Sequence, residues 1–85
     1  MKELTYVIKD EIGIHARPAG NLVRTLKDTK SKVTIECKGK SADAKKIFSL
    51  LSLAAKCGDV IKFIIDGEDE EKVYDDLLKY LNENL

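Results

Sequence analysis

The chain has little of what would place it in several common classes of protein. It has two cysteines, one proline and no tryptophan among 85 residues. Cys37 and Cys57 are too few for a disulfide framework and too far apart for a zinc knuckle, so we expect two small apolar side chains at or near the core. No apolar run approaches membrane-spanning length, and the N-terminal residues lack a signal-peptide layout. The sequence therefore predicts a reduced, soluble, cytoplasmic protein without membrane insertion.

The chain also has no excess of positive or negative charge. Fifteen basic residues balance fifteen acidic ones, which removes the usual electrostatic argument for binding a nucleic-acid backbone. The expected strands offer few aromatic side chains for base stacking, Tyr6 and Phe63 at most. With no second histidine and no closely spaced cysteine pair, a metal site is not expected. We therefore expect no nucleic-acid partner, no metal and no other cofactor.

Hydrophobic periodicity predicts seven short elements in the order β-α-β-β-α-β-α within a single domain, residues 1–85. The expected strands cover 4–8, 33–37, 41–44 and 60–65, and the expected helices cover 16–27, 47–55 and a stretch that begins after Asp69. The last strand is the most apolar and should lie inside the sheet. An α+β fold with an antiparallel or mixed sheet and all helices on one face satisfies this order.

Three details of the helices follow from local chemistry. Gly58 is placed to end the second helix as its C-cap glycine. Asp69 can cap the third helix, whose first turn is acidic. The inner stripe of the third helix is expected to consist of Val73, Leu77, Leu78 and Leu81.

The only histidine, His15, stands where a loop over 9–14 meets the first expected helix. At this N-cap position the backbone N–H groups of Ala16 and Arg17 would point toward anything attached to the ring, and the Arg17 side chain adds a full positive charge. Such a field disfavours imidazolium, leaves a neutral nucleophilic ring, and then stabilises a dianionic phosphoryl group. A histidine beside an arginine at a helix start is also a common capping or surface feature, and the local pattern leaves both interpretations open.

The second expected helix is unusually apolar. Seven of the nine residues over 47–55 are apolar, and they span an arc of about 220°, where a one-sided surface helix needs about 100°. We expect Phe48 and Leu51 to face outward as part of a partner surface. The alternative is a short helix almost engulfed by the fold.

The run Gly13-Ile14-His15-Ala16-Arg17-Pro18-Ala19 resembles the active-site signature of HPr, the family of histidine-containing phosphocarriers of the bacterial phosphoenolpyruvate-dependent sugar phosphotransferase system. The stretch over 45–54 is similar to a second family signature, and the resemblance extends over essentially the whole chain. It implies an open-faced β-sandwich, with a four-stranded antiparallel sheet and three helices on one face. It also implies that Enzyme I, charged by phosphoenolpyruvate, phosphorylates His15 at Nδ1, and that the A domain of a sugar-specific Enzyme II then receives the group.

The resemblance also assigns roles to other residues. Arg17 carries over as the phosphate-stabilising side chain, beside the N–H group of Ala16. The protein would be a monomeric carrier and not an enzyme, because its partner enzymes supply catalysis. The surface presented to both partners would consist of Gly20, Arg24, Ile47, Phe48, Leu51 and Ser52.

Two positions depart from the family pattern. Many members from low-GC Gram-positive bacteria have a regulatory serine just before the second helix, and this chain has Lys46 there. A lysine cannot be phosphorylated on oxygen and carries the opposite charge to phosphoserine, so we expect the serine switch to be absent or altered. Gly20 stands where a larger residue is common.

Three alternatives remain open from the sequence. The first is a paralogue that serves a regulatory relay instead of sugar uptake, with the same chemistry at His15. The second is a small α/β module that binds RNA or metabolites and uses His15 only as a helix cap. The third is an enzyme acting on a small molecule, although a substrate pocket is hard to build in so short a chain.

Overall fold

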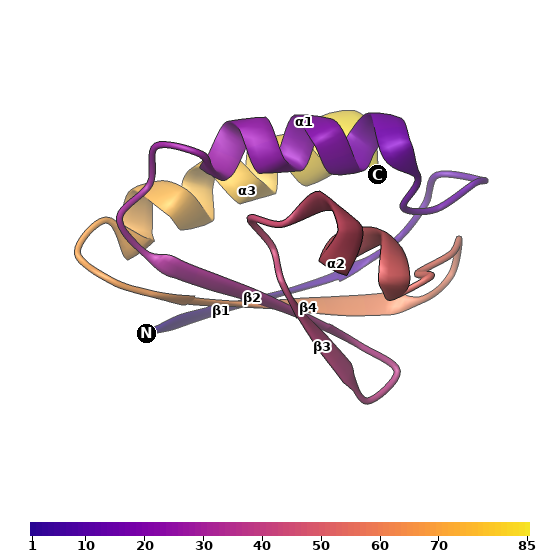
Figure 1. The fold of residues 1–85 in the computed structure, drawn as a ribbon, viewed down its shortest axis with the longest axis horizontal. Helices are drawn as coiled ribbons and strands as arrows, with labels where there is room; N and C mark the ends of the chain where they lie inside the picture. Colours follow the sequence, from indigo (N-terminus) through magenta and orange to yellow (C-terminus); the bar gives the residue numbers. More distant parts are fainter.

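In the computed structural model, which describes residues 1–85 throughout, the seven elements follow the expected order. The strands are β1 (Lys2–Val7), β2 (Lys32–Cys37), β3 (Lys40–Asp43) and β4 (Val60–Asp66). The helices are α1 (Ala16–Leu26), α2 (Ile47–Ser52) and α3 (Glu70–Asn84). The strands form one antiparallel sheet in the order β1-β4-β2-β3, and the three helices lie together on one side of it (Figure 1). This confirms the predicted open-faced α+β fold.

Strand β4 lies inside the sheet, between β1 and β2, as its apolar sequence predicts. Ile61, Phe63 and Ile65 are fully buried, while Lys62 and Ile64, on the opposite face, are partly exposed. This alternation is what a sheet with one face under helices and one face in water requires. Burial of a side chain as large as Phe63 contributes about 1.5–3 kcal/mol to the free energy of unfolding.

Helix α3 buries a stripe that differs by one residue from the predicted one. Val73, Leu77 and Leu81 are fully buried as expected, but Leu78 is 38% exposed and Tyr80 is buried in its place. The spacing explains the difference, because residues at i, i+4, i+7 and i+8 share one face of a helix. Leu78 follows Leu77 directly and is therefore turned about 100° away from that face.

Helix α2 is shorter than predicted and ends at Ser52. Ala54, with φ of 53°, adopts the left-handed conformation just past the helix end, and its N–H donates to the Leu51 carbonyl at 3.2 Å. The expected C-cap glycine, Gly58, lies farther along, in the turn before β4, where its N–H donates to the Ile8 carbonyl at 2.8 Å. The prediction that Gly58 ends α2 was wrong because Ala54 takes the left-handed position that usually favours glycine.

Two further expectations are wrong. Asp69 occupies the N-cap position of α3 without capping it. Its carboxylate instead accepts a hydrogen bond from the Lys30 N–H at 2.9 Å and another from the Ser31 hydroxyl. Cys37 is buried as expected, but Cys57 is exposed, and both thiols are free.

None of the three helices has the length and hydropathy needed to cross a bilayer.

Candidate functional site

His15 is the N-cap residue of α1, as the sequence predicts. Its backbone is extended, with φ of −130° and ψ of −175°, and its carbonyl accepts the Ala19 N–H at 3.0 Å. The ring makes no capping hydrogen bond to the helix, and 36% of the side chain is exposed. The ring is therefore positioned by the helix start and remains accessible to a partner.

The first turn of α1 has free hydrogen-bond donors beside this ring. The backbone N–H groups of Ala16 and Arg17 donate to no acceptor in the chain, and Pro18 has no N–H to donate. No acidic residue lies in this turn to offset the positive end of the helix. Because free N–H groups and the helix dipole both favour an anion, the turn can stabilise a phosphoryl group.

The loop before His15 is held closely against two other segments. The Ile14 N–H donates to the Ala55 carbonyl at 2.9 Å, and the Lys9 and Asp10 N–H groups donate to the Leu85 carbonyl at 2.6 and 3.0 Å. Gly13 is required here, because its φ is +84° and a Cβ would lie 2.4 Å from the Ala55 carbonyl oxygen. The position of His15 therefore depends on packing outside its own helix.

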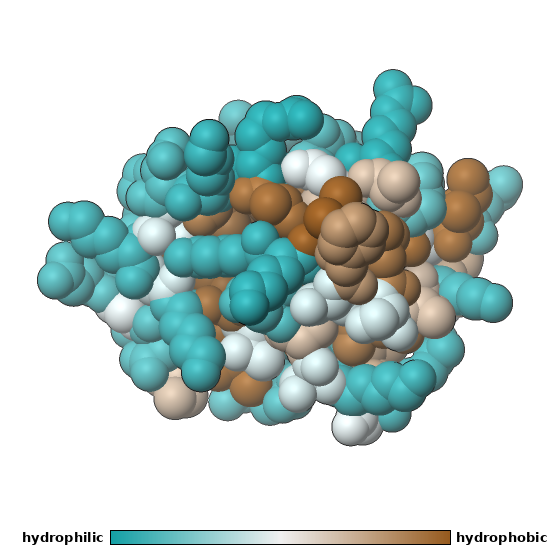
Figure 2. Space-filling model, in the orientation of Figure 1, coloured by the Kyte–Doolittle hydropathy of each residue, from teal (hydrophilic) through white to brown (hydrophobic).

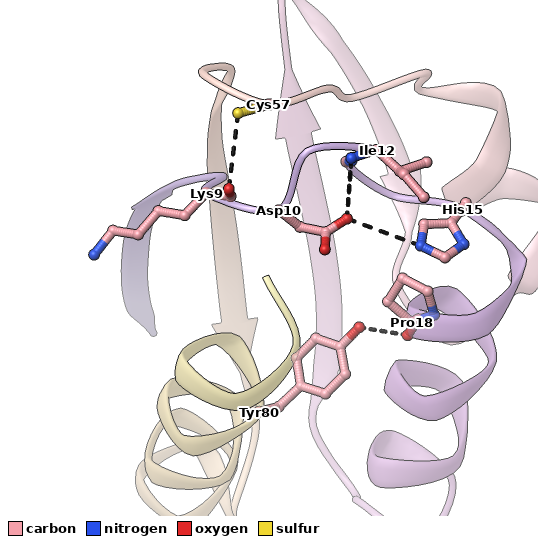
Figure 3. Close-up of polar contacts among 8 residues, drawn as sticks. Lys9, Asp10, Ile12, His15, Pro18, Cys57 and Tyr80 are labelled. Atoms are coloured by element: carbon pink, nitrogen blue, oxygen red, sulfur yellow. Dashed lines mark hydrogen bonds and ion pairs between the residues drawn. The ribbon is translucent and has the colours of Figure 1, made fainter.

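Asp10 is a site residue that the sequence analysis missed. Its Oδ2 accepts the N–H groups of Ile12 and Gly13, both at 3.2 Å, and lies 3.9 Å from Nε2 of His15 (Figure 3). An aspartate whose carboxylate bonds to N–H groups two and three residues farther on is typical of a tight turn. That local signal predicts the turn, but not the contact with the ring.

Tyr80 supports the same helix turn from α3. Its hydroxyl donates a hydrogen bond to the Pro18 carbonyl (Figure 3), and burial raises the pKa of this phenol above its ordinary value. A buried tyrosine hydroxyl usually finds a hydrogen-bond partner. The sequence could have suggested that Tyr80 bonds to something, but not that its partner is the first turn of α1.

A surface hollow of about 410 Å³ surrounds His15. Arg17 lines it, and its side chain is exposed and forms no ion pair in the structure. No group of three or more His, Cys, Asp or Glu side chains is arranged to hold a metal ion. The residues that line the hollow are Asp10, Ile12, His15, Arg17, Pro18, Asn21, Glu83 and Asn84.

The residues expected on the partner surface lie on α1 and α2. Phe48 is 84% exposed and faces outward as expected. Leu51, which was also expected to face outward, is half-buried and packs against the core, as does Ile47. The two helices are in contact at Gly20, where a Cβ would lie 3.9 Å from Cδ1 of Ile47. Figure 2 shows an apolar area on the face that carries α2 in Figure 1.

The remaining expected surface residues are polar. The exposed Arg24 donates to Oδ1 of Asn21 at 3.1 Å, and the Ser52 hydroxyl donates to the Ser49 carbonyl at 2.7 Å. Lys46 is exposed at the N-cap of α2, the place where the family resemblance expects a serine. The expected surface therefore combines an exposed aromatic side chain with cationic and hydroxyl groups.

Comparisons with known proteins identify the family to which this chain is similar. A family model described as "PTS HPr component phosphorylation site" matches residues 2–83. The phosphocarrier protein HPr of Xylella fastidiosa (strain 9a5c) is 40% identical over 70 residues, which cover 82% of this chain and 79% of the relative.

Two solved structures extend the likeness to the fold. A Mycoplasma histidine-containing phosphocarrier protein is similar with a TM-score of 0.94 and 27% identity, over 96% of this chain and 93% of that one. The HPr dimer from Thermoanaerobacter tengcongensis is similar with a TM-score of 0.76 and 36% identity, over 98% and 95% of the two chains.

Proposed function

Because this chain belongs to the HPr family of histidine-containing phosphocarriers, we propose that it accepts a phosphoryl group on His15 from Enzyme I and donates it to the A domain of an Enzyme II. The observation that carries this proposal is the position of His15. The accessible imidazole belongs to the N-cap residue of a helix whose first two N–H groups are free. The group would thus arrive at a point where the helix already favours negative charge.

The chemistry assigned to the site needs few residues. The lone pair of Nδ1 attacks the phosphorus, and the N–H groups of Ala16 and Arg17 then stabilise the transferred oxygens. The Arg17 side chain, which has no competing ion pair and lines the same hollow, supplies a mobile positive charge. A modest number of donors suits a carrier, because a phosphoryl group held too firmly would not be passed on.

The partner surface is assigned to Gly20, Arg24, Ile47, Phe48, Leu51 and Ser52. Its support is the direct contact between α1 and α2 and the exposure of Phe48. One surface that serves a donor and an acceptor in turn must form small, short-lived contacts. We propose that the carrier works in the cytoplasm, as the family resemblance implies, and as a monomer, since its core residues are buried within one chain.

Lys46 gives the carrier a fixed positive charge where relatives can be switched by phosphoserine. We propose that the serine switch is absent and that Lys46 favours acidic partner surfaces. Treatment with the kinase that modifies the family's regulatory serine should leave the chain unmodified. Phosphoserine found at Ser49 or Ser52 would contradict this assignment.

The proposed function is tested with Enzyme I of the same organism and phosphoenolpyruvate. The intact protein should gain the mass of one phosphoryl group, and acid should remove it. His15→Ala should abolish the gain, and Arg17→Ala should slow transfer to an Enzyme II A domain. If the folded wild-type protein gains no phosphoryl group, the proposed function is wrong.

A further inference from the structure

The carboxylate of Asp10 faces one edge of the His15 ring. Its Oδ2 lies 3.9 Å from Nε2, and no other carboxylate lies within 4.0 Å of the ring nitrogens. The two side chains are exposed to a similar extent, 36% for His15 and 37% for Asp10. Figure 3 shows the second ring nitrogen on the side away from the carboxylate.

The loop fixes this carboxylate independently of the ring. The Asp10 main chain is held by its N–H bond to the Leu85 carbonyl. The same Oδ2 atom that faces Nε2 also accepts the N–H groups of Ile12 and Gly13 at 3.2 Å. Because several backbone groups orient Asp10, its side chain needs little reorganisation to act on the ring.

We propose that Asp10 is a positioning residue for His15. Its carboxylate favours the tautomer that carries the proton on Nε2, and this leaves the lone pair of Nδ1 free to attack phosphorus. The inference rests on the proposed function and adds to it the group that selects the reacting nitrogen. The separation of 3.9 Å is longer than a hydrogen bond, and an approach of about 1 Å would form one, a contraction common when reaction partners bind.

Atoms and charge are conserved in the transfer step when the proton is on Nε2. The Nδ1 lone pair forms the new N–P bond, while the bond between phosphorus and the phosphorylated donor protein breaks and returns its electron pair to the donor. The proton stays on Nε2 throughout. The phosphorylated ring is then a cation, and Asp10 is its counter-ion. A ring protonated at Nε2 also leaves phosphorus more readily when the group is passed on.

The test compares Asp10→Asn with Glu11→Gln, which neutralises the adjacent carboxylate. Glu11 is exposed and makes no hydrogen bond or ion pair, so it is a matched control. The first readout is the nitrogen-15 chemical shifts of the ring, recorded on the free protein at a pH where the ring is neutral. Asp10→Asn should lower the population of the tautomer protonated on Nε2, and Glu11→Gln should leave it unchanged.

The second readout is the rate of phosphoryl transfer from charged Enzyme I. A partly exposed carboxylate beside a ring that gains positive charge during transfer predicts transfer about fivefold slower in Asp10→Asn, and no change in Glu11→Gln. The amide shifts of Ile12 and Gly13 show whether the loop is retained. If Asp10→Asn does not retain the loop, Asp10→Glu is used as the second variant. Because it keeps the negative charge, it should accept the phosphoryl group faster than Asp10→Asn.

The outcomes separate this inference from the proposed function. If wild type accepts a phosphoryl group but Asp10→Asn has unchanged ring shifts or an unchanged rate, the inference is overturned and the carrier function stands. An Asp10→Glu variant as slow as Asp10→Asn overturns it as well. If wild type accepts no phosphoryl group, the proposed function fails and the role of Asp10 in transfer fails with it.

Discussion

The phenol of Tyr80 in α3 donates a hydrogen bond to the main-chain carbonyl of Pro18 in the first turn of α1. Tyr80 is 5% exposed, and the partners are 62 residues apart in the sequence. The bond ties the C-terminal helix to the helix turn that follows His15. The last helix thus contributes to the geometry of the site through Tyr80.

Tyr80→Phe should lower the free energy of unfolding by about 1 kcal/mol, because it removes one buried hydrogen bond and leaves the Pro18 carbonyl with one partner fewer. Denaturant unfolding measures the change. Tyr74→Phe is the control, since Tyr74 is half-buried and its hydroxyl makes no hydrogen bond. Equal stability of the two variants would show that the Tyr80 bond contributes nothing.

Gly13→Ala should be more damaging than an alanine at most other positions. The new Cβ would meet the Ala55 carbonyl at 2.4 Å, in a backbone with φ of +84°. Overpacking and strain together should cost about 2–4 kcal/mol of the free energy of unfolding, and displacement of the loop should slow phosphoryl acceptance. Gly39→Ala is the control that has the backbone strain without the clash, because Gly39 has φ of +79° but nothing within 4 Å of a Cβ. A cost as small as that of Gly39→Ala would contradict the close approach.

Ala54→Gly should stabilise the protein. Ala54 is exposed and has φ of 53°, a conformation that glycine adopts without the penalty an alanine meets. We expect a gain of about 0.5–1 kcal/mol, which corresponds to a Tm higher by about 3–6 °C in a domain of this size. Ala54→Val should shift Tm in the opposite direction. A glycine variant with a lower Tm would show that Ala54 is not strained.

Stability at acid pH should depend on Asp69. Hydrogen bonds from the Ser31 hydroxyl and then from the Lys30 N–H hold the pKa of this carboxyl below its ordinary value. A carboxyl with a lowered folded-state pKa stabilises the fold above its unfolded value of about 3.9, and this contribution is lost as the pH falls through the folded-state value. Asp69→Asn should therefore flatten the decline of Tm below about pH 4. Asp28→Asn, at an exposed side chain without partners, should leave the decline unchanged.

The sequence was sufficient for the element order and for His15 at a helix start, since both depend on local periodicity and on Pro18 in the first turn. It was insufficient where the outcome depends on contacts between distant segments. The contact of Asp10 with His15 requires the loop to be held by Ala55 and Leu85, and neither residue is near in the sequence. The early end of α2 was missed for a different reason, because local propensity favours glycine and not Ala54 at the left-handed position.

The last prediction concerns the partner surface. Phe48 is 84% exposed, so Phe48→Ala should leave the free energy of unfolding within about 0.5 kcal/mol of wild type. An exposed aromatic side chain at the centre of an interface is a common hot spot, and its loss should weaken association with Enzyme I by about 1–2 kcal/mol, or about 5- to 30-fold. This should appear as a higher KM of Enzyme I for the carrier. Val60→Ala is the matched control, because Val60 is 53% exposed on the face of the sheet opposite the helices. If both variants leave KM unchanged, the surface on α1 and α2 is not where Enzyme I binds.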